Sequence, residues 1–190
     1  MQVLQKLSWY KNRLSLMSSG EVFYRVNKVC KGYYYKIKRE TYSQQKKMLP
    51  KMQTYLFEIG DLDLITNFYN ENPEYQKSLI HAADQILLHR FSFFSFENYY
   101  LGTKLNWHKD YANQKTAKLS FYTDLDYRDF RKHGDAKFVW EINRFTHFFT
   151  LAQAYFLSNN THYAEEIVLQ LTDWIDQNPY LMGINWTSAL

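Results

Sequence analysis

The sequence has few of the residues that form covalent crosslinks or rigid turns. Its 190 residues include one cysteine, three prolines and six glycines. A single thiol, Cys30, excludes an internal disulfide and any zinc site built from several cysteines. No nucleophile motif surrounds Cys30, so we expect a buried or chemically inert thiol with no part in function.

Long apolar runs are also absent. No stretch approaches the roughly 18 uncharged apolar residues of a membrane span. The opening segment MQVLQKLSWYKNRLSL carries charges where a signal peptide has its apolar centre. We therefore expect a soluble protein without a membrane span, located in the cytoplasm, with a periplasmic location as the alternative.

Aromatic residues, by contrast, are abundant. They make up 19% of the chain, and hydrophobic residues make up 46%, which is enough to bury a core within one domain. The sequence contains no glycine-rich phosphate loop, no Gly-x-Ser-x-Gly elbow and no His-Glu-x-x-His motif. We expect no cofactor and no metal site.

Charge is distributed unevenly along the chain. Residues 1–51 contain 12 Lys and Arg against 2 Asp and Glu, whereas the remainder is acidic overall. The segment KGYYYKIKRETYSQQKKMLPK interleaves cations with aromatic rings, a composition suited to an acidic polysaccharide, a nucleic acid or an anionic membrane surface. The alternative is a solvated helical extension whose Lys and Arg stems cover apolar surface.

Local signals divide the chain into helices and one aromatic strand region. Ser18 and Glu21 have the spacing of a capping box and predict a helix start. Pro50 marks a boundary between a basic helical extension, 1–51, and a second domain, 52–190. Apolar spacing predicts a helix over 74–88, and Phe-rich alternation over 91–100 predicts a short strand that turns near Gly102.

The last third of the chain predicts two antiparallel helices. From Gly134 a single helix is expected to reach Phe156, followed by SNNTH and a second helix that stops at Asn178 and Pro179. The two apolar stripes consist of Phe138, Ile142, Phe145, Phe149, Ala152 and Phe156, and of Tyr163, Ile167, Leu171, Trp174 and Ile175.

The first of these helices carries an unusual set of polar groups. Helical spacing places Trp140, Asn143, Arg144 and His147 on one side. Glu141 lies three residues before Arg144 and is expected to pair with it, and Lys137 can extend the pair into a ladder. The alternative is an ordinary surface row of ion pairs beside a satisfied histidine.

Two segments resemble a known family. GDAKFVWEINR and, at the family's spacing, WIDQNPYLMGINW are similar to motifs in the N-terminal domain of heparinase II/III-type polysaccharide lyases. RLSLMSSGEVFYRV, RFSFFSF and LNWHKDY resemble weaker parts of the same domain. The resemblance implies a mainly α fold, an incomplete α/α toroid of helical hairpins with a short aromatic β segment.

The resemblance also implies a reaction, β-elimination of an acidic, uronate-containing polysaccharide. Alginate, glycosaminoglycans and bacterial polysaccharides are the implied substrates. In the family, the asparagine, tyrosine and histidines that carry the chemistry lie in later helices and in a C-terminal β domain. No catalytic residue is therefore assigned to this chain, which ends at Leu190 and is expected to be inactive alone.

What the resemblance implies for this chain is a set of substrate-side residues. These are Lys137, Trp140, Glu141, Asn143, Arg144, Asn185 and Trp186. Arg144 can bind a carboxylate or sulfate through its planar guanidinium, and a tryptophan can stack on a sugar ring. For the tryptophans a core position is the alternative, as is a backbone-bonding turn for Asn185. His147 and Tyr155 are expected to face the packed side of the helix.

Two functions remain open at this point. The chain is either the N-terminal part of a polysaccharide lyase or a noncatalytic module that binds acidic polysaccharide or another polyanion. No nucleic-acid docking motif accompanies the basic residues, so a nucleic acid is not expected as partner. An open toroid edge exposes apolar surface, from which self-association is expected.

Overall fold

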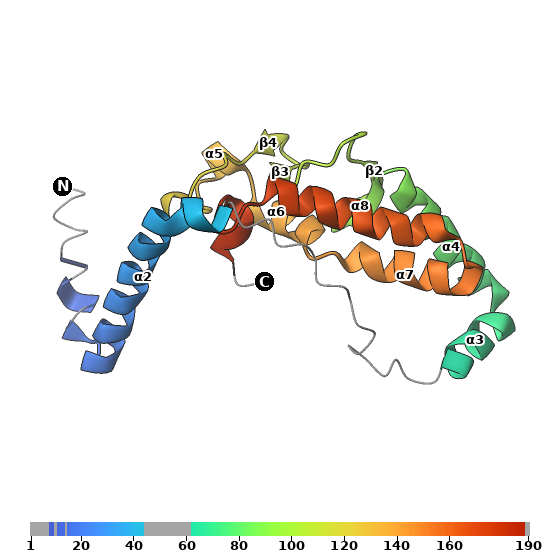
Figure 1. Cartoon of the computed structure of the whole chain (residues 1–190), viewed down its shortest axis with the longest axis horizontal. Helices are drawn as coiled ribbons and strands as arrows, with labels where there is room; N and C mark the ends of the chain where they lie inside the picture. The colour runs from blue at the N-terminus through green and yellow to red at the C-terminus, as the bar shows by residue number, and fades with distance from the viewer. Residues whose placement is uncertain (1–7, 10, 14, 44–61, 189–190) are drawn as a thin grey trace. The chain divides into compact units, whose positions relative to one another are not determined.

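The computed structural model describes residues 8, 9, 11–13, 15–43 and 62–188 of the chain. The chain divides into two units, Met1–Lys46 and Lys47–Leu190. The described part consists mainly of helices with short antiparallel strands (Figure 1), so the predicted mainly α class is confirmed. The predicted boundary at Pro50 lies outside the described residues, and the toroid stays a prediction.

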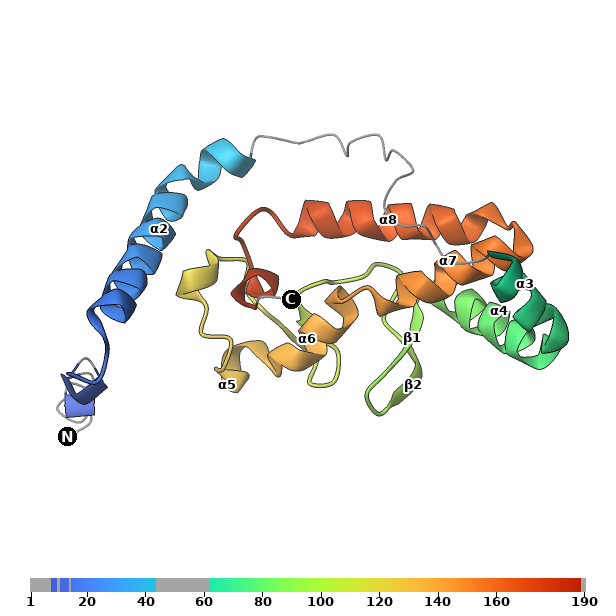
Figure 2. The same ribbon diagram turned by 90° about the horizontal axis from the view of Figure 1, so that it is seen from below.

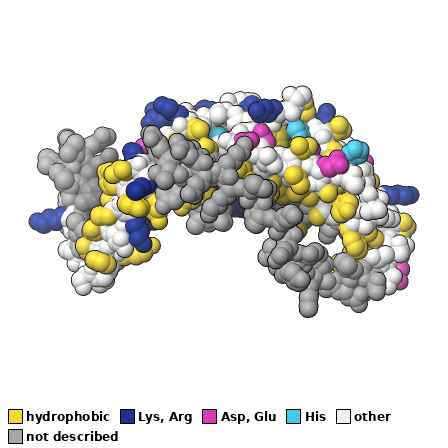
Figure 3. Space-filling model, in the orientation of Figure 1, with side chains coloured by type: hydrophobic (Ala, Val, Ile, Leu, Met, Phe, Trp, Pro, Cys, Tyr) yellow, Lys and Arg dark blue, Asp and Glu magenta, His cyan; other side chains and the backbone are white. Residues whose placement is uncertain are grey.

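The first unit is built on one long helix, α2 (Ser19–Ser43). The backbone N–H of Glu21 donates to Ser18 Oγ at 3.2 Å, as the capping signal predicts, while the Glu21 carboxylate accepts from Arg25 at 2.8 Å. Cys30 is exposed, so the first of the two alternatives, a buried thiol, is wrong, and a chemically inert thiol stays a prediction. In Figure 3 hydrophobic and basic side chains lie side by side over α2.

The second unit holds the remaining described elements. In order they are α3 (Leu62–Glu71), α4 (Pro73–Leu87), β1 (Arg90–Phe93), β2 (Phe96–Tyr100), β3 (Lys109–Asp110), β4 (Lys115–Thr116), η1 (Tyr122–Asp124), α5 (Phe130–His133), α6 (Ala136–Asn143), α7 (Thr146–Ser158), α8 (Thr161–Gln177) and η2 (Ile184–Thr187). The helix expected over 74–88 is present, and α3 was not predicted. None of the described helices combines the length and apolar character needed to cross a bilayer.

The aromatic strand region is a hairpin rather than a single strand. β1 and β2 pair antiparallel, with Arg90 opposite Tyr100 and Phe93 opposite Phe96. The chain therefore reverses at residues 94–95, not near Gly102 as expected. Phe94 adopts a φ of 50°, the left-handed conformation that tight hairpin turns require. Aromatic rings cluster at the tip of the hairpin, where the ring centroids of Phe94 and Phe138 lie 4.9 Å apart.

The single helix expected from Gly134 to Phe156 is broken in two. Helix α6 ends at Asn143, and α7 begins at Thr146. Phe145 between them has a φ of 56°, a left-handed conformation that a continuous right-handed helix cannot contain. The predicted apolar stripe is interrupted there, and Phe149 and Phe156 are exposed.

Helices α7 and α8 form the predicted antiparallel hairpin and lie side by side in Figures 1 and 2. Asn159 takes a left-handed conformation at the end of α7, and the Asn160 side chain accepts from the His162 N–H to cap α8. Helix α4 packs against α7, and the Tyr163 hydroxyl of α8 donates to Asp84 of α4 at 2.7 Å. One of the two buried clusters of the described residues lies between these helices and the aromatic hairpin, and the other surrounds Val139 of α6 and Ile184 of η2.

Candidate functional site

The two family-like motifs meet at one backbone carbonyl. Asn143, at the end of α6, donates through Nδ2 to the carbonyl oxygen of Trp107 at 3.1 Å. Asn185, in η2, donates to the same oxygen at 2.9 Å. Both asparagines are buried. A connection that has no regular structure of its own is thus fixed from two sides.

Further hydrogen bonds hold both asparagine amides in place. Asn143 Oδ1 accepts from Trp174 Nε1 of α8 at 2.6 Å, and Asn143 Nδ2 also donates to the Val139 carbonyl. Asn185 Nδ2 donates to Asn178 Oδ1 at 2.8 Å. A buried polar group is costly unless its hydrogen bonds are satisfied. The Asn143 amide uses both of its N–H groups and its oxygen, whereas Asn185 Oδ1 is buried and has no partner among the described residues.

The two tryptophans of the motifs pack within the second unit. Trp140 is half-buried against Tyr127, and its Nε1 donates to the Ile184 carbonyl at 3.2 Å. Trp186 is half-buried, with its ring near Trp174 and Tyr180. Trp140 therefore ties the first motif to the second through Ile184, which is fully buried.

Of the two ion pairs predicted among Lys137, Glu141 and Arg144, the structure contains the pair between Glu141 and Arg144. Arg144 Nη1 pairs with Glu141 Oε2 at 3.1 Å, and the Arg144 side chain is 52% exposed. Lys137 is exposed, and no ion pair joins it to Glu141. The Glu141 carboxylate orients one face of the guanidinium and leaves its other donors open to solvent.

The break at Phe145 also separates groups that a continuous helix would have aligned. His147 lies in the first turn of α7, while Trp140, Asn143 and Arg144 belong to α6 or its end. The expected single polar face is therefore wrong. His147 packs edge-on against Phe91 and Phe148, in agreement with its predicted packed position, whereas Tyr155 is exposed.

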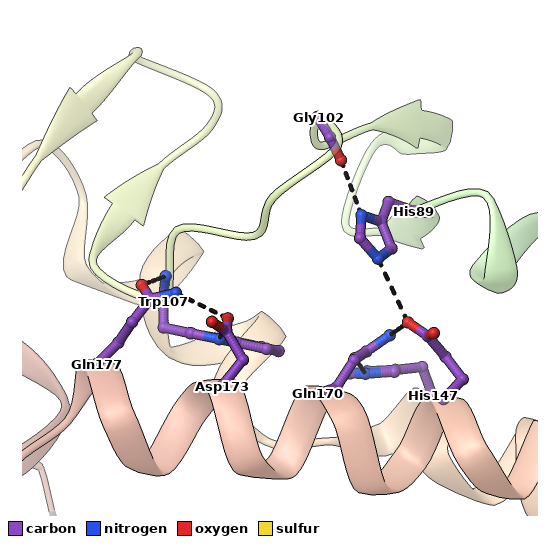
Figure 4. A network of polar contacts seen from close by, with 8 residues as sticks. His89, Gly102, Trp107, His147, Gln170, Asp173 and Gln177 are labelled. Atoms are coloured by element: carbon purple, nitrogen blue, oxygen red, sulfur yellow. Dashed lines mark hydrogen bonds and ion pairs between the residues drawn. The ribbon is translucent and has the colours of Figure 1, made fainter.

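A row of polar side chains along α8 was not singled out from the sequence. Its members are Glu166, Gln170, Asp173 and Gln177. Figure 4 shows that Gln170, Asp173 and Gln177 face the segments around His89, Trp107 and His147. Their spacing of four, three and four residues places them on one side of a helix and is the signal that identifies the row.

Each end of the row secures a different segment. Asp173 accepts from Trp107 Nε1 at 2.9 Å, and Gln177 accepts from the Trp107 backbone N–H at 3.3 Å. At the other end Glu166 lies 3.3 Å from His89 Nε2 and accepts from Gln170 Nε2 at 2.7 Å. The row therefore fixes the loop that carries Trp107 against α8.

The two histidines beside this row have opposite pKa shifts. The hydrogen bond to Glu166 raises the pKa of His89 above its usual 6.5. Burial lowers the pKa of His147 to about 4, against a smaller opposing effect of its hydrogen bond to Gln170. At neutral pH His147 is therefore an uncharged imidazole.

A cavity of about 310 Å³ is lined in part by Glu141, the partner of Arg144. Apolar atoms of α4, β1 and α6 form part of its wall. Its lining residues also include the polar Arg90, Glu141, Thr146 and His147. Within the described ranges, no group of three or more His, Cys, Asp or Glu side chains is arranged to hold a metal ion.

Comparison with protein families gives a match over most of the chain. The family model described as Heparinase II/III N-terminus matches residues 29–188, a range that includes both motifs and the Trp107 segment. No curated protein and no solved structure matches the chain. The match begins inside α2 and continues to the end of η2.

Proposed function

Because residues 29–188 match the N-terminal region of the heparinase II/III family, the chain belongs to that family. From this premise we propose that the chain is the scaffold and substrate-side part of a polysaccharide lyase. The substrate is an acidic, uronate-containing polysaccharide, and the reaction is β-elimination. The observation that carries the proposal is the family match over residues 29–188.

The proposal divides the seven substrate-side candidates into two groups. Lys137 and Arg144 are exposed cations, and Glu141 orients the Arg144 guanidinium toward a carboxylate or sulfate. Asn143 and Asn185 act behind them, because their hydrogen bonds hold the Trp107 segment in place. Trp186 packs near Trp174, whose Nε1 donates to Asn143. Trp140 joins the groups through its bond to Ile184 and its half-exposed ring.

Elimination requires more than this surface supplies. The uronate carboxylate must be neutralised, a base must remove the C5 proton, and an acid must protonate the leaving oxygen. Arg144 serves only the first duty, because a guanidinium stays protonated and cannot act as a base. Groups that act as a unit lose nearly all activity when a member is missing. We therefore expect no cleavage by the 190-residue chain.

The test is the ultraviolet absorbance of the unsaturated uronate product on alginate, heparin and hyaluronan. We expect no product from the 190-residue chain and, where the chain forms part of a longer protein, measurable product from that longer protein. Arg144→Ala in that longer protein is expected to lower kcat/KM by 10-fold or more, since a charge-assisted contact contributes about 1.5–3 kcal/mol. A longer protein that cleaves no polymer of the panel contradicts the lyase assignment.

A second candidate function is a noncatalytic module for acidic polymers. It is favoured by the basic composition of residues 1–51 and by the exposed Lys28, Lys31 and Lys38 of α2. Replacing these three lysines by glutamine is then expected to weaken binding to heparin at least 10-fold at low salt. The charge-matched control replaces the exposed Lys77, Lys104 and Lys118 of the second unit. Equal affinities of the two triple variants exclude α2 as the main contact.

A further inference from the structure

The cavity beside Glu141 lies between three parts of the second unit that are separate in the sequence. Its walls come from the C-terminal half of α4, from the β1–β2 hairpin and from the α6–α7 junction. Two aromatic residues, Phe91 and Phe93, line it together with residues of both charge signs, Arg90 and Glu141. A mixture of aromatic rings with a few convergent polar groups is typical of sites that bind small polar ligands.

The imidazole of His147 is fixed in one tautomer. Glu166 lies beside Gln170 and, as a carboxylate, accepts from Gln170 Nε2 at 2.7 Å. The other end of that amide, Oε1, therefore faces His147 and lies 2.7 Å from its Nε2. An amide oxygen only accepts, so Nε2 of His147 carries the hydrogen and Nδ1 carries a free lone pair.

The Nδ1 atom of His147 is open to a ligand. Four polar side-chain atoms of the described residues are fully buried and have no partner, and Nδ1 of His147 is not one of them. An atom that lacks a partner and is not among these four is accessible from outside the protein. No protein donor to Nδ1 is found within the described part of the chain. His147 is a lining residue of the cavity, and the subsite requires that its accessible Nδ1 faces that space. Phe91 and Phe148, edge-on to the ring, keep it from turning away.

Two charged side chains complete the lining. The Arg90 guanidinium lies over the Tyr100 ring at 5.6 Å and uses Nη1 on the Asn98 carbonyl, which leaves donors for a ligand. Glu141, already paired with Arg144, offers a second acceptor. The cavity thus presents one cationic donor and two acceptors, which suits a ligand with a carboxylate and adjacent hydroxyl groups.

We propose that this cavity is a subsite for one uronate unit of the polysaccharide. A sugar hydroxyl donates to His147 Nδ1, a second hydroxyl donates to Glu141, and the uronate carboxylate accepts from Arg90. The identity of the ligand as part of a polysaccharide rests on the proposed function. His147 acts here as a binding residue, and Glu166 and Gln170 are positioning residues that act through it.

Histidine ¹⁵N NMR on the full 190-residue chain tests the subsite directly. The free protein is expected to show the Nε2–H tautomer for His147. Addition of glucuronate is expected to shift the His147 Nδ1 resonance, while glucose shifts it less and acetate hardly at all. His162, an exposed histidine of α8, is the internal control and should not respond. An Nδ1–H tautomer, or an Nδ1 resonance that glucuronate leaves unmoved, overturns the proposal.

Two variants separate the subsite from the wider function. Arg90→Gln is expected to weaken glucuronate binding about 5-fold or more, and Thr150→Leu, which fills the cavity, to abolish the shift. Binding of a uronate tetrasaccharide is measured in parallel by calorimetry. If both variants bind it as tightly as the original chain, the subsite is wrong and the proposed function stands. If the original chain binds no tetrasaccharide, the subsite and the proposed substrate surface fail together.

Discussion

Asn143 and Asn185 donate to the same oxygen atom, the carbonyl of Trp107, from two helical elements that are distant in sequence. The relationship explains why the segments GDAKFVWEINR and WIDQNPYLMGINW occur together: each supplies one amide to a loop that lies between the aromatic hairpin and the last helices. Their first physical role is to hold that loop in place. Substrate contact by these two residues remains a prediction.

Asn143→Ala is expected to lower the free energy of unfolding by about 2 kcal/mol or more. The variant leaves Trp174 Nε1 without its acceptor in a partly buried position, and such a group carries its full desolvation cost. Urea unfolding measures the change. Asn67→Ala in α3 is the matched control, because Asn67 is exposed, and we expect it to change stability by less than about 0.5 kcal/mol. Equal effects of the two changes contradict the structural role of Asn143.

Gly134→Ala is expected to be strongly destabilising, by about 3 kcal/mol. Gly134 has φ 75° and ψ −157°, a region that only glycine occupies readily, and an added Cβ would collide with the Asp110 carboxylate. Gly20→Ala supplies the comparison, since Gly20 lies in the first turn of α2 with no close neighbour. The Gly20 variant should be neutral or slightly stabilising. Urea unfolding measures both variants. A soluble Gly134→Ala protein whose urea midpoint is unchanged would refute the close approach of Gly134 to Asp110.

The lowered pKa of His147 predicts a loss of stability in acid. Its folded-state pKa of about 4 lies below the ordinary 6.5, so the unfolded chain binds the proton first as pH falls. Stability associated with His147 is therefore present above about pH 6.5 and is lost progressively toward about pH 4, by about 2 kcal/mol at pH 4.5. His89 opposes this trend, because its raised pKa stabilises the fold at low pH and the contribution is lost as pH rises.

The measurement compares urea unfolding at pH 7 and pH 4.5. His147→Gln removes the titrating ring, so the variant should lose less stability between these pH values than the original chain does. Its lower stability at pH 7 does not affect this difference. His162→Gln, at an exposed position, should leave the pH dependence unchanged. An identical pH dependence for all three proteins means that His147 is not the buried titrating group.

Arg144→Ala is expected to separate binding from stability. The Glu141–Arg144 pair has one partner 52% exposed, and surface pairs of this kind contribute about 0–1 kcal/mol. The thermal midpoint should therefore change little, while affinity for a uronate tetrasaccharide falls several-fold. Arg131→Ala, another exposed cation of the second unit, controls for net charge. If the two variants bind equally well, Arg144 makes no specific contact with the polysaccharide, and the Glu141–Arg144 pair is an ordinary surface ion pair.

Self-association of the chain is expected through apolar side chains on α7 and α8. Phe149, Val168 and Leu169 are each more than half exposed, with exposed fractions of 73%, 59% and 64%. Exposed apolar surface of this kind favours association. Analytical ultracentrifugation should show concentration-dependent oligomers that Phe149→Ser with Leu169→Ser reduces. A monomer at all concentrations would contradict the expectation.

Local sequence signals account for much of the fold. The capping serine of α2, the proline at the start of α4, the SNNTH connection and the stop at Asn178 and Pro179 each depend on neighbouring residues only. Such signals act within a few residues, and apolar periodicity adds the helical face. The sequence by itself thus determined the mainly α class, the α7–α8 hairpin and the positions of the two motifs.

Tertiary structure decided where those elements break and what their polar groups contact. Apolar spacing continues through Phe145, yet packing of that ring against Trp107, Phe148 and Trp174 accompanies a left-handed residue that ends α6. The spacing of apolar residues along the sequence does not indicate this helix break. Likewise, a hydrogen bond to a distant backbone carbonyl leaves no mark in the sequence, because every residue has a carbonyl. The meeting of Asn143 and Asn185 on Trp107, and the open face of His147, therefore exist only in the folded chain.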